Sequence, residues 1–252
     1  MIAKKIINMI CFHVKNLWST SFFRQTSVIL PLSFFLLSVM GSRWTLKDDL
    51  LFNASISGLW GTTTTATGLI AFQRFQGVLQ YLALSTLPSW SVFLSLMISA
   101  ALIGLVAVPI SVFCTYILSL LSYQRFPDVT PNQVIGLLLA VLACVASAVL
   151  LSTLFVYSRH ASSFEPLILV PVWMLCGIVV PTDTFPPLLK EIAFIHPLTS
   201  AVRVARFNSI VPKELIFIFL CCFLSFIYIL IGAFGLKNAI NHARIKGDLS
   251  LS

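Results

Sequence analysis

The chain has few charged residues: 10% of its 252 residues are Asp, Glu, Lys or Arg, whereas 58% are hydrophobic. A water-soluble fold of this size has no core large enough to hide several uninterrupted apolar runs, but a bilayer solvates them readily. The mean hydropathy of +0.99 indicates the same environment. The composition therefore predicts an integral membrane protein.

The sequence also lacks the motifs of common enzyme classes. It contains no GxxxxGK[ST] phosphate loop, no HExxH and no GxSxG, so it has no usual ATP-hydrolysing site and no recognised hydrolase nucleophile. Glu165 is the candidate acid nearest an apolar run, and its position just before Pro166 favours a helix-capping role. We expect a chain that is not an enzyme and that binds no cofactor itself.

Metal and nucleic-acid sites are also not expected. The six cysteines form no CxxC pair and lie in or beside apolar runs, where thiols behave as small hydrophobic side chains. The formal net charge is +8, but the basic residues are spread between the apolar runs and form no dense basic and aromatic face. Such residues set membrane topology.

Six apolar segments follow one another and are predicted to cross the membrane, since a helix of roughly 20 apolar residues spans a bilayer. Pro109 is a candidate kink in the third segment, and the fifth is short and interrupted by Pro171. The first can borrow a turn from residues 21–25. Residues 1–252 thus form one all-α transmembrane domain, with predicted spans over 26–41, 50–71, 90–121, 133–157, 166–181 and 215–236.

Two segments are too polar to span and carry apolar residues on one helical face. In residues 1–22, Ile6, Ile10, Val14 and Leu17 recur at helical spacing with lysines largely opposite. This pattern predicts a helix lying flat in the cytoplasmic interface, and a solvated leader is the alternative. Residues 72–88 place apolar side chains on one face and glutamines on another, which predicts a second cytoplasmic interfacial helix.

Residues 183–208 are apolar but repeatedly broken. The Asp-Thr pair at 183–184 can cap a short helix with Pro186-Pro187 in its first turn, and His196-Pro197 ends that helix before another can begin. Helix-breaking sequence at membrane depth survives only where protein or water surrounds it. We predict a re-entrant helical hairpin in the outer leaflet.

Small and hydroxylated residues fill positions 61–68 of the second predicted span. Threonine hydroxyls bond to carbonyls of the preceding turn, and small side chains let helices approach closely. Helix packing is the favoured interpretation, and the lining of a substrate path is the alternative. Thr62 and Thr65, with Trp173 in the fifth span, are candidates for a pathway or dimer seam.

Orientation rests on the basic residues. With six crossings, Lys and Arg divide nine to seven between the two faces, with nine on the face of the termini. Four of the nine, Lys4, Lys5, Lys15 and Arg24, precede the first span, where orientation is most often decided. Both termini are therefore predicted to lie in the cytoplasm.

The order of these features is similar to that of the permease subunits of type-2 ABC exporters. Two patches carry the resemblance. The first is Phe75-Gln76-Gly77-Val78-Leu79-Gln80-Tyr81-Leu82 followed by Thr86-Leu87-Pro88; the second comprises Gly177, Pro181, Phe185-Pro186-Pro187-Leu188, Ile192, His196-Pro197-Leu198-Thr199 and Arg206. Val78 and Gln80 stand where the family usually has Thr and Glu. His196 stands where Asn is common, a change expected to affect only the turn.

The resemblance implies a bacterial plasma-membrane complex in which two permease chains, identical or different, form the pathway. Two separate ABC ATPase subunits carrying ATP and Mg would dock underneath. The helix over 72–88 would be the coupling helix, and its contacts with the ATPase would be Gln73, Arg74, Gln76, Gly77, Gln80 and Tyr81. The hairpin would form the extracellular gate, with Phe185, Pro186, Pro187, His196, Pro197, Arg203 and Arg206. The first, second and fifth spans would line the path or the dimer seam.

Two other function classes are less well supported. An ATP-independent carrier or channel usually buries charged residues in mid-span, and this chain has almost none. A membrane enzyme would need a catalytic cluster. The path has no charged ring, which favours an amphipathic or hydrophobic cargo such as a drug, antibiotic or small antimicrobial peptide. Export of polysaccharide or lipid-linked glycan is the alternative.

Overall fold

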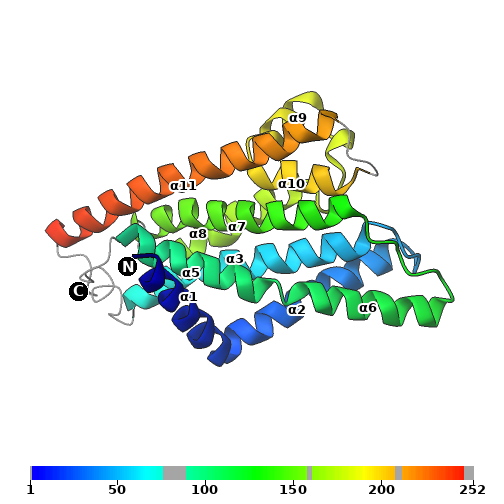
Figure 1. Cartoon of the computed structure of the whole chain (residues 1–252), viewed down its shortest axis with the longest axis horizontal. Helices are drawn as coiled ribbons and strands as arrows, with labels where there is room; N and C mark the ends of the chain where they lie inside the picture. The colour runs from blue at the N-terminus through cyan, green and yellow to red at the C-terminus, as the bar shows by residue number, and fades with distance from the viewer. Residues whose placement is uncertain (1, 76–88, 158–160, 208–211, 247–252) are drawn as a thin grey trace.

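A computed structural model describes residues 2–75, 89–157, 161–207 and 212–246. These residues form a helical bundle without a strand among them, and most of the long helices run roughly along one direction (Figure 1). The helices are α1 (Ile2–Ser19), α2 (Ser21–Gly41), α3 (Leu50–Phe75), α5 (Ser89–Gly104), α6 (Ala107–Ser122), α7 (Pro131–Tyr157), α8 (Ala161–Leu175), η1 (Thr182–Thr184), α9 (Pro187–Phe194), α10 (Pro197–Ala205) and α11 (Pro212–Lys246).

Several helical segments are long and apolar enough to cross a membrane. Within the described residues they number four: Ser21–Gly41, Trp90–Ser122, Pro131–Phe155 and Leu215–Asn238. The chain is therefore a multi-pass membrane protein. Helices α3 and α8, which cover most of the second and fifth predicted spans, fall outside this set. Helix α8 has only 15 residues, and α3 contains many Ser and Thr residues.

Helix α3 can contain many polar residues because other helices surround it. It packs against α2, α5, α6, α7 and α8, and residues 52–60 are all buried. Several of its hydroxyls donate within the helix, among them Thr63 to the Leu59 carbonyl at 2.7 Å and Thr65 to that of Gly61 at 2.6 Å, whereas the buried Thr62 Oγ1 has no hydrogen-bond partner among the described residues. A helix enclosed by other helices needs no continuous apolar surface towards lipid.

The third predicted span, 90–121, consists of two helices. Helix α5 ends at Gly104 and α6 begins at Ala107, so the candidate kink at Pro109 takes the form of a break one turn earlier. Proline has no amide hydrogen, and its ring clashes with the carbonyl four residues before it. The turn between the helices is closed by shorter-range bonds, from Val106 N to Ile103 O and from Val108 N to Leu105 O, both 3.0 Å.

Other boundaries differ from the sequence-based ranges. Helix α2 starts at Ser21, which includes the borrowed turn, and Thr20 separates it from α1. Helix α3 continues to Phe75, so the first residues of the segment predicted as a separate helix over 72–88 extend α3 instead. Residues 76–88 lie outside the described part of the chain. Helix α11 exceeds the predicted 215–236 range at both ends.

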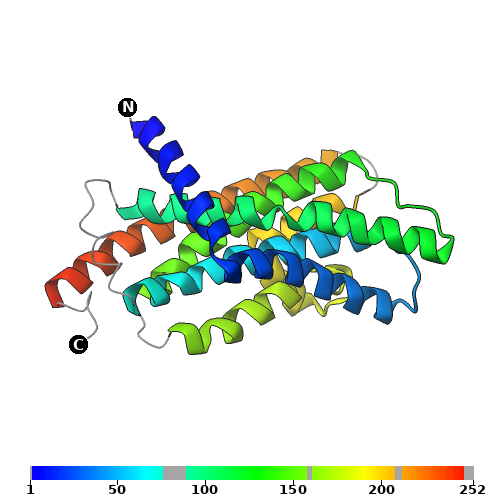
Figure 2. The ribbon, with the colours of Figure 1, turned by 90° about the horizontal axis from the view of Figure 1, so that it is seen from below.

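Helix α1 leaves the bundle at an angle to α2 (Figure 2). It packs against α5 and α2, and Ser99 of α5 donates a hydrogen bond to the Ile10 carbonyl at 3.1 Å. His13 and Leu17 are buried, whereas Ile7 and Phe12 are 59% and 64% exposed. Some apolar side chains of α1 therefore pack against the bundle, and others face away from it.

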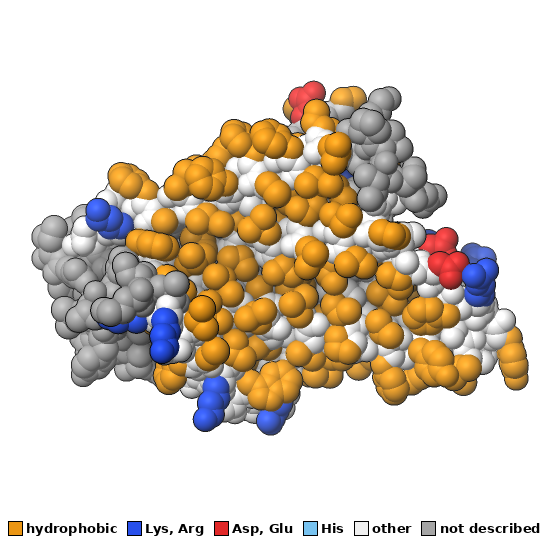
Figure 3. Space-filling model, in the orientation of Figure 1, with side chains coloured by type: hydrophobic (Ala, Val, Ile, Leu, Met, Phe, Trp, Pro, Cys, Tyr) orange, Lys and Arg blue, Asp and Glu red, His pale blue; other side chains and the backbone are white. Residues whose placement is uncertain are grey.

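Charge is distributed unequally between the ends of the molecule. The surface is apolar along its length. Lys and Arg lie at the end that holds α1 and the C-terminal end of α11, and acidic residues lie near the opposite end (Figure 3). Among described side chains, the first end carries Lys4, Lys5, Lys15, Arg24 and Lys237 and no acid. The described acids Asp48, Asp49, Asp128, Asp183 and Glu191 all belong to the opposite end, where the hairpin lies.

Candidate functional site

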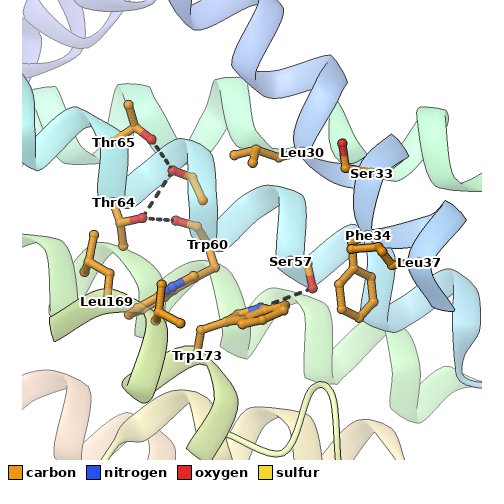
Figure 4. Close-up of a pocket in the computed structure, with 12 residues that line it drawn as sticks. Leu30, Ser33, Phe34, Leu37, Ser57, Trp60, Thr64, Thr65, Leu169 and Trp173 are labelled. Atoms are coloured by element: carbon orange, nitrogen blue, oxygen red, sulfur yellow. Dashed lines mark hydrogen bonds between the residues drawn. The ribbon is translucent and has the colours of Figure 1, made fainter. Parts of the chain in front are cut away.

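Helices α2, α3 and α8 border an open groove of about 520 Å³ (Figure 4). These helices correspond to the first, second and fifth predicted spans. No charged side chain that the structure describes lines the groove. Its apolar lining comprises Leu30, Phe34, Leu37, Trp60, Leu169, Val170 and Trp173, and its hydroxyls come from Ser33, Ser57, Thr64 and Thr65.

The indole of Trp173 is held in place across this groove. Its Nε1 donates to Ser57 Oγ of α3 at 3.3 Å, and its ring meets Phe34 of α2 edge-on with centroids 5.5 Å apart. Figure 4 shows this bond opposite the α2 side chains Leu30, Ser33 and Leu37. Trp60 is only 4% exposed, so most of its ring is covered by protein. The Trp173 side chain of α8 therefore contacts both α2 and α3.

A second hollow of about 340 Å³ continues the groove towards the hairpin end. The two hollows share Phe34, Leu37 and Trp173. Unlike the first, the second is also lined by charged and amide side chains, among them Lys47, Asp49 and Asn53. The combined groove is apolar along α2, α3 and α8 and polar at its end.

The residues predicted for a pathway or seam fall in different places. Thr65 and Trp173 line the groove. Thr62 is 0% exposed and is not among the lining residues, so it belongs to the interior of the bundle. Ser57 and Trp60 also line the groove but were not among the residues predicted from the sequence. Trp60 directly precedes the small-residue stretch, a neighbourhood that could have indicated it.

The hairpin begins with a turn after α8, where Gly177 has a φ of +84° that a residue with a side chain rarely adopts. The expected cap at Asp183 or Thr184 is absent: α9 begins at Pro187, and Pro186 occupies the N-cap position without a side-chain cap. Proline at these positions needs no amide partner, so α9 can begin without an acidic cap.

Asp183 instead fastens the hairpin together. Its Oδ1 accepts from Lys190 Nζ at 2.8 Å and from Arg203 Nη1 at 3.0 Å. The hydrogen bond from Lys190 is the largest cause that holds the pKa of this carboxyl below its ordinary value; burial acts in the opposite direction, and the charge of Arg203 lowers the pKa further. The ion pairs join the 3₁₀ turn η1 to both α9 and α10.

His196 is the N-cap of α10, and its Nδ1 accepts from the Leu198 amide at 3.3 Å. A nitrogen that accepts carries no proton, so in the neutral ring Nε2 can donate to Ser147 Oγ of α7, 3.0 Å away. The ring also meets Trp60 of α3 and Tyr228 of α11 edge-on. The expectation that His196 affects only the turn is wrong, because its side chain contacts three long helices.

The other predicted gate residues differ in burial and in their contacts. Pro197 is buried, Phe185 is half-buried, and Pro186 and Pro187 are exposed. The Arg203 guanidinium lies 5.0 Å from the ring centroid of Phe217 on α11 and also faces Phe194 and Phe207. Arg206 lies 3.7 Å from Asp49, just before α3. The two arginines therefore connect α10 to α11 and α3.

The predicted ATPase contacts are described only in part. Gln73 and Arg74 belong to the last turn of α3, and Gln76, Gly77, Gln80 and Tyr81 lie outside the described residues. Within the described part of the chain, no group of three His, Cys, Asp or Glu side chains is placed to hold a metal ion.

Comparison with known proteins agrees with this architecture. The ABC-2 type transporter family model matches residues 5–210, which include α1, the groove and the hairpin. The comparison with curated proteins gives no match. Because the family match covers most of the chain, the protein belongs to the ABC-2 type transporter family as a membrane permease subunit.

Proposed function

We propose that this chain is the permease subunit of an ATP-driven ABC exporter that moves an amphipathic or hydrophobic substrate along the groove between α2, α3 and α8. The observation that carries the proposal is the uncharged described lining of that groove, with charged and amide side chains only at one end. Apolar cargo loses little hydration on entering such a lining, whereas a highly charged cargo would lose its water without compensation.

The proposed topology has six crossings: α2, α3, α5 with α6, α7, α8 and α11. The end where α1 and α11 terminate would face the cytoplasm. Its described charged side chains are all basic, whereas the opposite end mixes acids and bases. Cytoplasmic segments of membrane proteins carry an excess of Lys and Arg, which supports this orientation and a location in a bacterial plasma membrane. The hairpin of α9 and α10 would then be the re-entrant extracellular element.

The proposed motor consists of two separate ABC ATPase subunits that bind ATP and Mg. Helix α3 ends and α5 begins at the basic end of the bundle, which is the side proposed for docking (Figure 1). Gln73, Arg74, Gln76, Gly77, Gln80 and Tyr81 would make the contact. A second permease chain, identical or different, would close the open side of the groove.

The hairpin would act as the gate because it is fastened to helices that border or support the groove. Arg206 pairs with Asp49 before α3, and His196 contacts Trp60, which also lines the groove. A displacement of α3 by the ATPases would therefore reach the hairpin directly. Rigid-body shifts of this kind are a common means of switching between two states.

Polysaccharide export by the same kind of complex is the weaker alternative. Sugar stacking needs accessible aromatic faces, and Trp60 is almost fully covered by protein. Trp173 alone among the groove's two indoles is partly accessible, and the rest of the lining is mainly aliphatic and hydroxylated side chains. An apolar or amphipathic cargo fits this lining better.

The test is copurification and reconstitution. The tagged chain should capture an untagged ABC ATPase, and the pair should accumulate a hydrophobic dye in inverted vesicles only with ATP. Gly77→Trp should abolish capture, whereas Gly41→Trp, at a glycine with open space around it at the other end of the bundle, should not. Transport by the purified chain without an ATPase would overturn the proposal.

A further inference from the structure

The groove has the polarity of an amphiphile. Its larger hollow contains no charge, and the hollow that continues it contains Lys47, Asp49 and Asn53. Phe34, Leu37 and Trp173 line both parts, so a single molecule can extend from one into the other. An occupant would place its apolar part beside Trp173 and its polar group towards the hairpin end.

The two charged side chains that line the polar end differ in their pairing. Asp49 is already engaged, because its Oδ2 accepts from Asn53 Nδ2 at 3.0 Å and lies 3.7 Å from Arg206 Nη2. Lys47 is exposed and has no ion-pair partner among the residues that the structure describes. Of the two charged side chains that line this hollow, Asp49 is therefore paired with Arg206, and Lys47 is left unpaired among the described residues. This favours an occupant with one negative charge.

The position of Lys47 is fixed by its neighbours. The Leu46 amide donates to Gln124 Oε1 at 2.7 Å, and Gln124 Nε2 donates to the Trp44 carbonyl at 3.1 Å. On the other side, Gln133 Nε2 donates to the Asp48 carbonyl at 3.3 Å. The loop between α2 and α3 is thus hydrogen-bonded to the segment between α6 and α7 and to the first turn of α7. The ammonium group is therefore presented at the mouth of the groove from an ordered backbone.

We propose that the cargo is a carboxylate amphiphile: an apolar chain or flat apolar body that ends in one carboxylate. The apolar part lies against Trp173, Leu169 and Phe34, and the carboxylate pairs with Lys47. A cationic head group would meet an Asp49 that Arg206 and Asn53 already satisfy. A phosphate monoester carries nearly two negative charges and exceeds the single positive charge available. This inference rests on the proposed function, since it assigns the head group of a cargo in that groove.

Equilibrium binding to the purified permease tests the head group without an ATPase. The full chain is placed in nanodiscs of phosphatidylcholine, and energy transfer from tryptophan to 11-(dansylamino)undecanoic acid is measured. The same tail is tested as its methyl ester and with a trimethylammonium head group. The acid should bind about fivefold more tightly than the ester, the size expected for one exposed ion pair. Dodecyl phosphate should displace the acid less well than dodecanoate does.

Two variants locate the interaction. Lys47→Gln should reduce the preference for acid over ester to none, whereas Arg43→Gln should leave it unchanged, because Arg43 lies in the same loop but does not line the groove. Ser33→Phe fills the apolar part and should weaken both probes. Monodisperse elution of each variant shows that it is folded.

The results that overturn the inference are distinct from those that overturn the proposed function. Equal binding of acid and ester, tighter binding of the cationic probe, or a preference that survives Lys47→Gln would each reject the carboxylate assignment. If Ser33→Phe still blocks both probes, the groove remains the cargo site. If Ser33→Phe changes neither, the groove binds no amphiphile and the proposed path fails with it.

Discussion

The His196 ring nitrogen Nε2 lies 3.0 Å from the Ser147 hydroxyl, which joins the start of α10 to α7 inside the bundle. Ser147 also donates to the Ala143 carbonyl at 2.7 Å, so this hydroxyl can accept from the imidazole while its own hydrogen is engaged. The N-cap of a short helix in the hairpin is therefore part of the bundle interior.

This arrangement predicts graded effects of substitution at His196. His196→Ala removes the α10 cap and leaves a cavity beside Trp60, and we expect a loss of about 2–4 kcal/mol of unfolding free energy. His196→Asn keeps a side-chain cap but loses the contacts with Trp60 and Ser147, so its loss should be about 1–2 kcal/mol. Denaturant unfolding in detergent measures both.

Ser147→Ala is the matched control for the two His196 substitutions. It removes the two hydrogen bonds of the Ser147 hydroxyl and keeps both the cap and the ring packing, so its effect should be below that of His196→Ala. If His196→Asn were as stable as the unchanged chain, the bonds of His196 to α3 and α7 would contribute nothing measurable.

Close packing of α7 and α11 depends on Gly232. A Cβ at this position would lie 2.8 Å from Val149 Cγ1 and 2.9 Å from the Val149 carbonyl carbon, and backbone atoms cannot move aside cheaply. Thr153 Oγ1 also donates to the Gly232 carbonyl at 3.0 Å. We expect Gly232→Ala to cost about 1–3 kcal/mol through overpacking.

Gly41→Ala is the control for this substitution, because a Cβ there would meet nothing within 4 Å. Its thermal midpoint in detergent should stay within the error of the unchanged chain. Equal midpoints for the Gly232 and Gly41 variants would contradict the packing argument.

The burial of His13 predicts that the packing of α1 against α5 depends on pH. The side chain is 6% exposed, its Nε2 has no hydrogen-bond partner, and burial lowers its pKa below the ordinary 6.5. The released state therefore binds the proton more readily than the packed state. Packing of α1 against α5 should be strongest above pH 6.5 and weaken as the pH falls below it. Hydrogen exchange of the α1 amides across this range measures the effect.

His13→Leu should remove this part of the pH dependence. Leucine occupies a similar volume and leaves no unsatisfied polar atom, so the α1 amides should also be better protected at neutral pH. An unchanged pH profile in this variant would show that another group titrates.

Asp183 predicts a separate effect at acid pH. Its pKa is lowered by Lys190 and Arg203 from an ordinary value of 3.8, so its ion pairs stabilise the hairpin fully above that value. The contribution is lost as the pH falls through the lowered pKa. Between neutral pH and that range, Asp183→Asn should increase hydrogen exchange of the α9 amides, and the difference from the unchanged chain should shrink as the acid limit is reached. Thr184→Ala, which keeps the carboxylate, should behave like the unchanged chain.

The sequence by itself determined where most of the membrane-spanning helices and their breaks lie, because these depend on local chemistry. Long apolar runs over α2, α5 with α6, α7 and α11 have no stable alternative to helices in a membrane, because each backbone polar group must be satisfied within its own segment. Pro109 indicated a kink, which the structure has as a break between α5 and α6, and His196-Pro197 indicated the join between two short helices, because proline restricts the backbone wherever it stands. The family resemblance, which the comparison of residues 5–210 confirms, rested on the same local patterns.

Only the tertiary structure decided which faces of these helices meet. In a chain apolar on nearly every face, helical periodicity does not distinguish a lipid-facing side from a buried one. For this reason the sequence could not show that Thr62 is enclosed while Thr65 borders the groove, or that Trp173 reaches Ser57. The contacts of His196 likewise join residues far apart in the chain, and the packing of α3, α7, α10 and α11 brings them together.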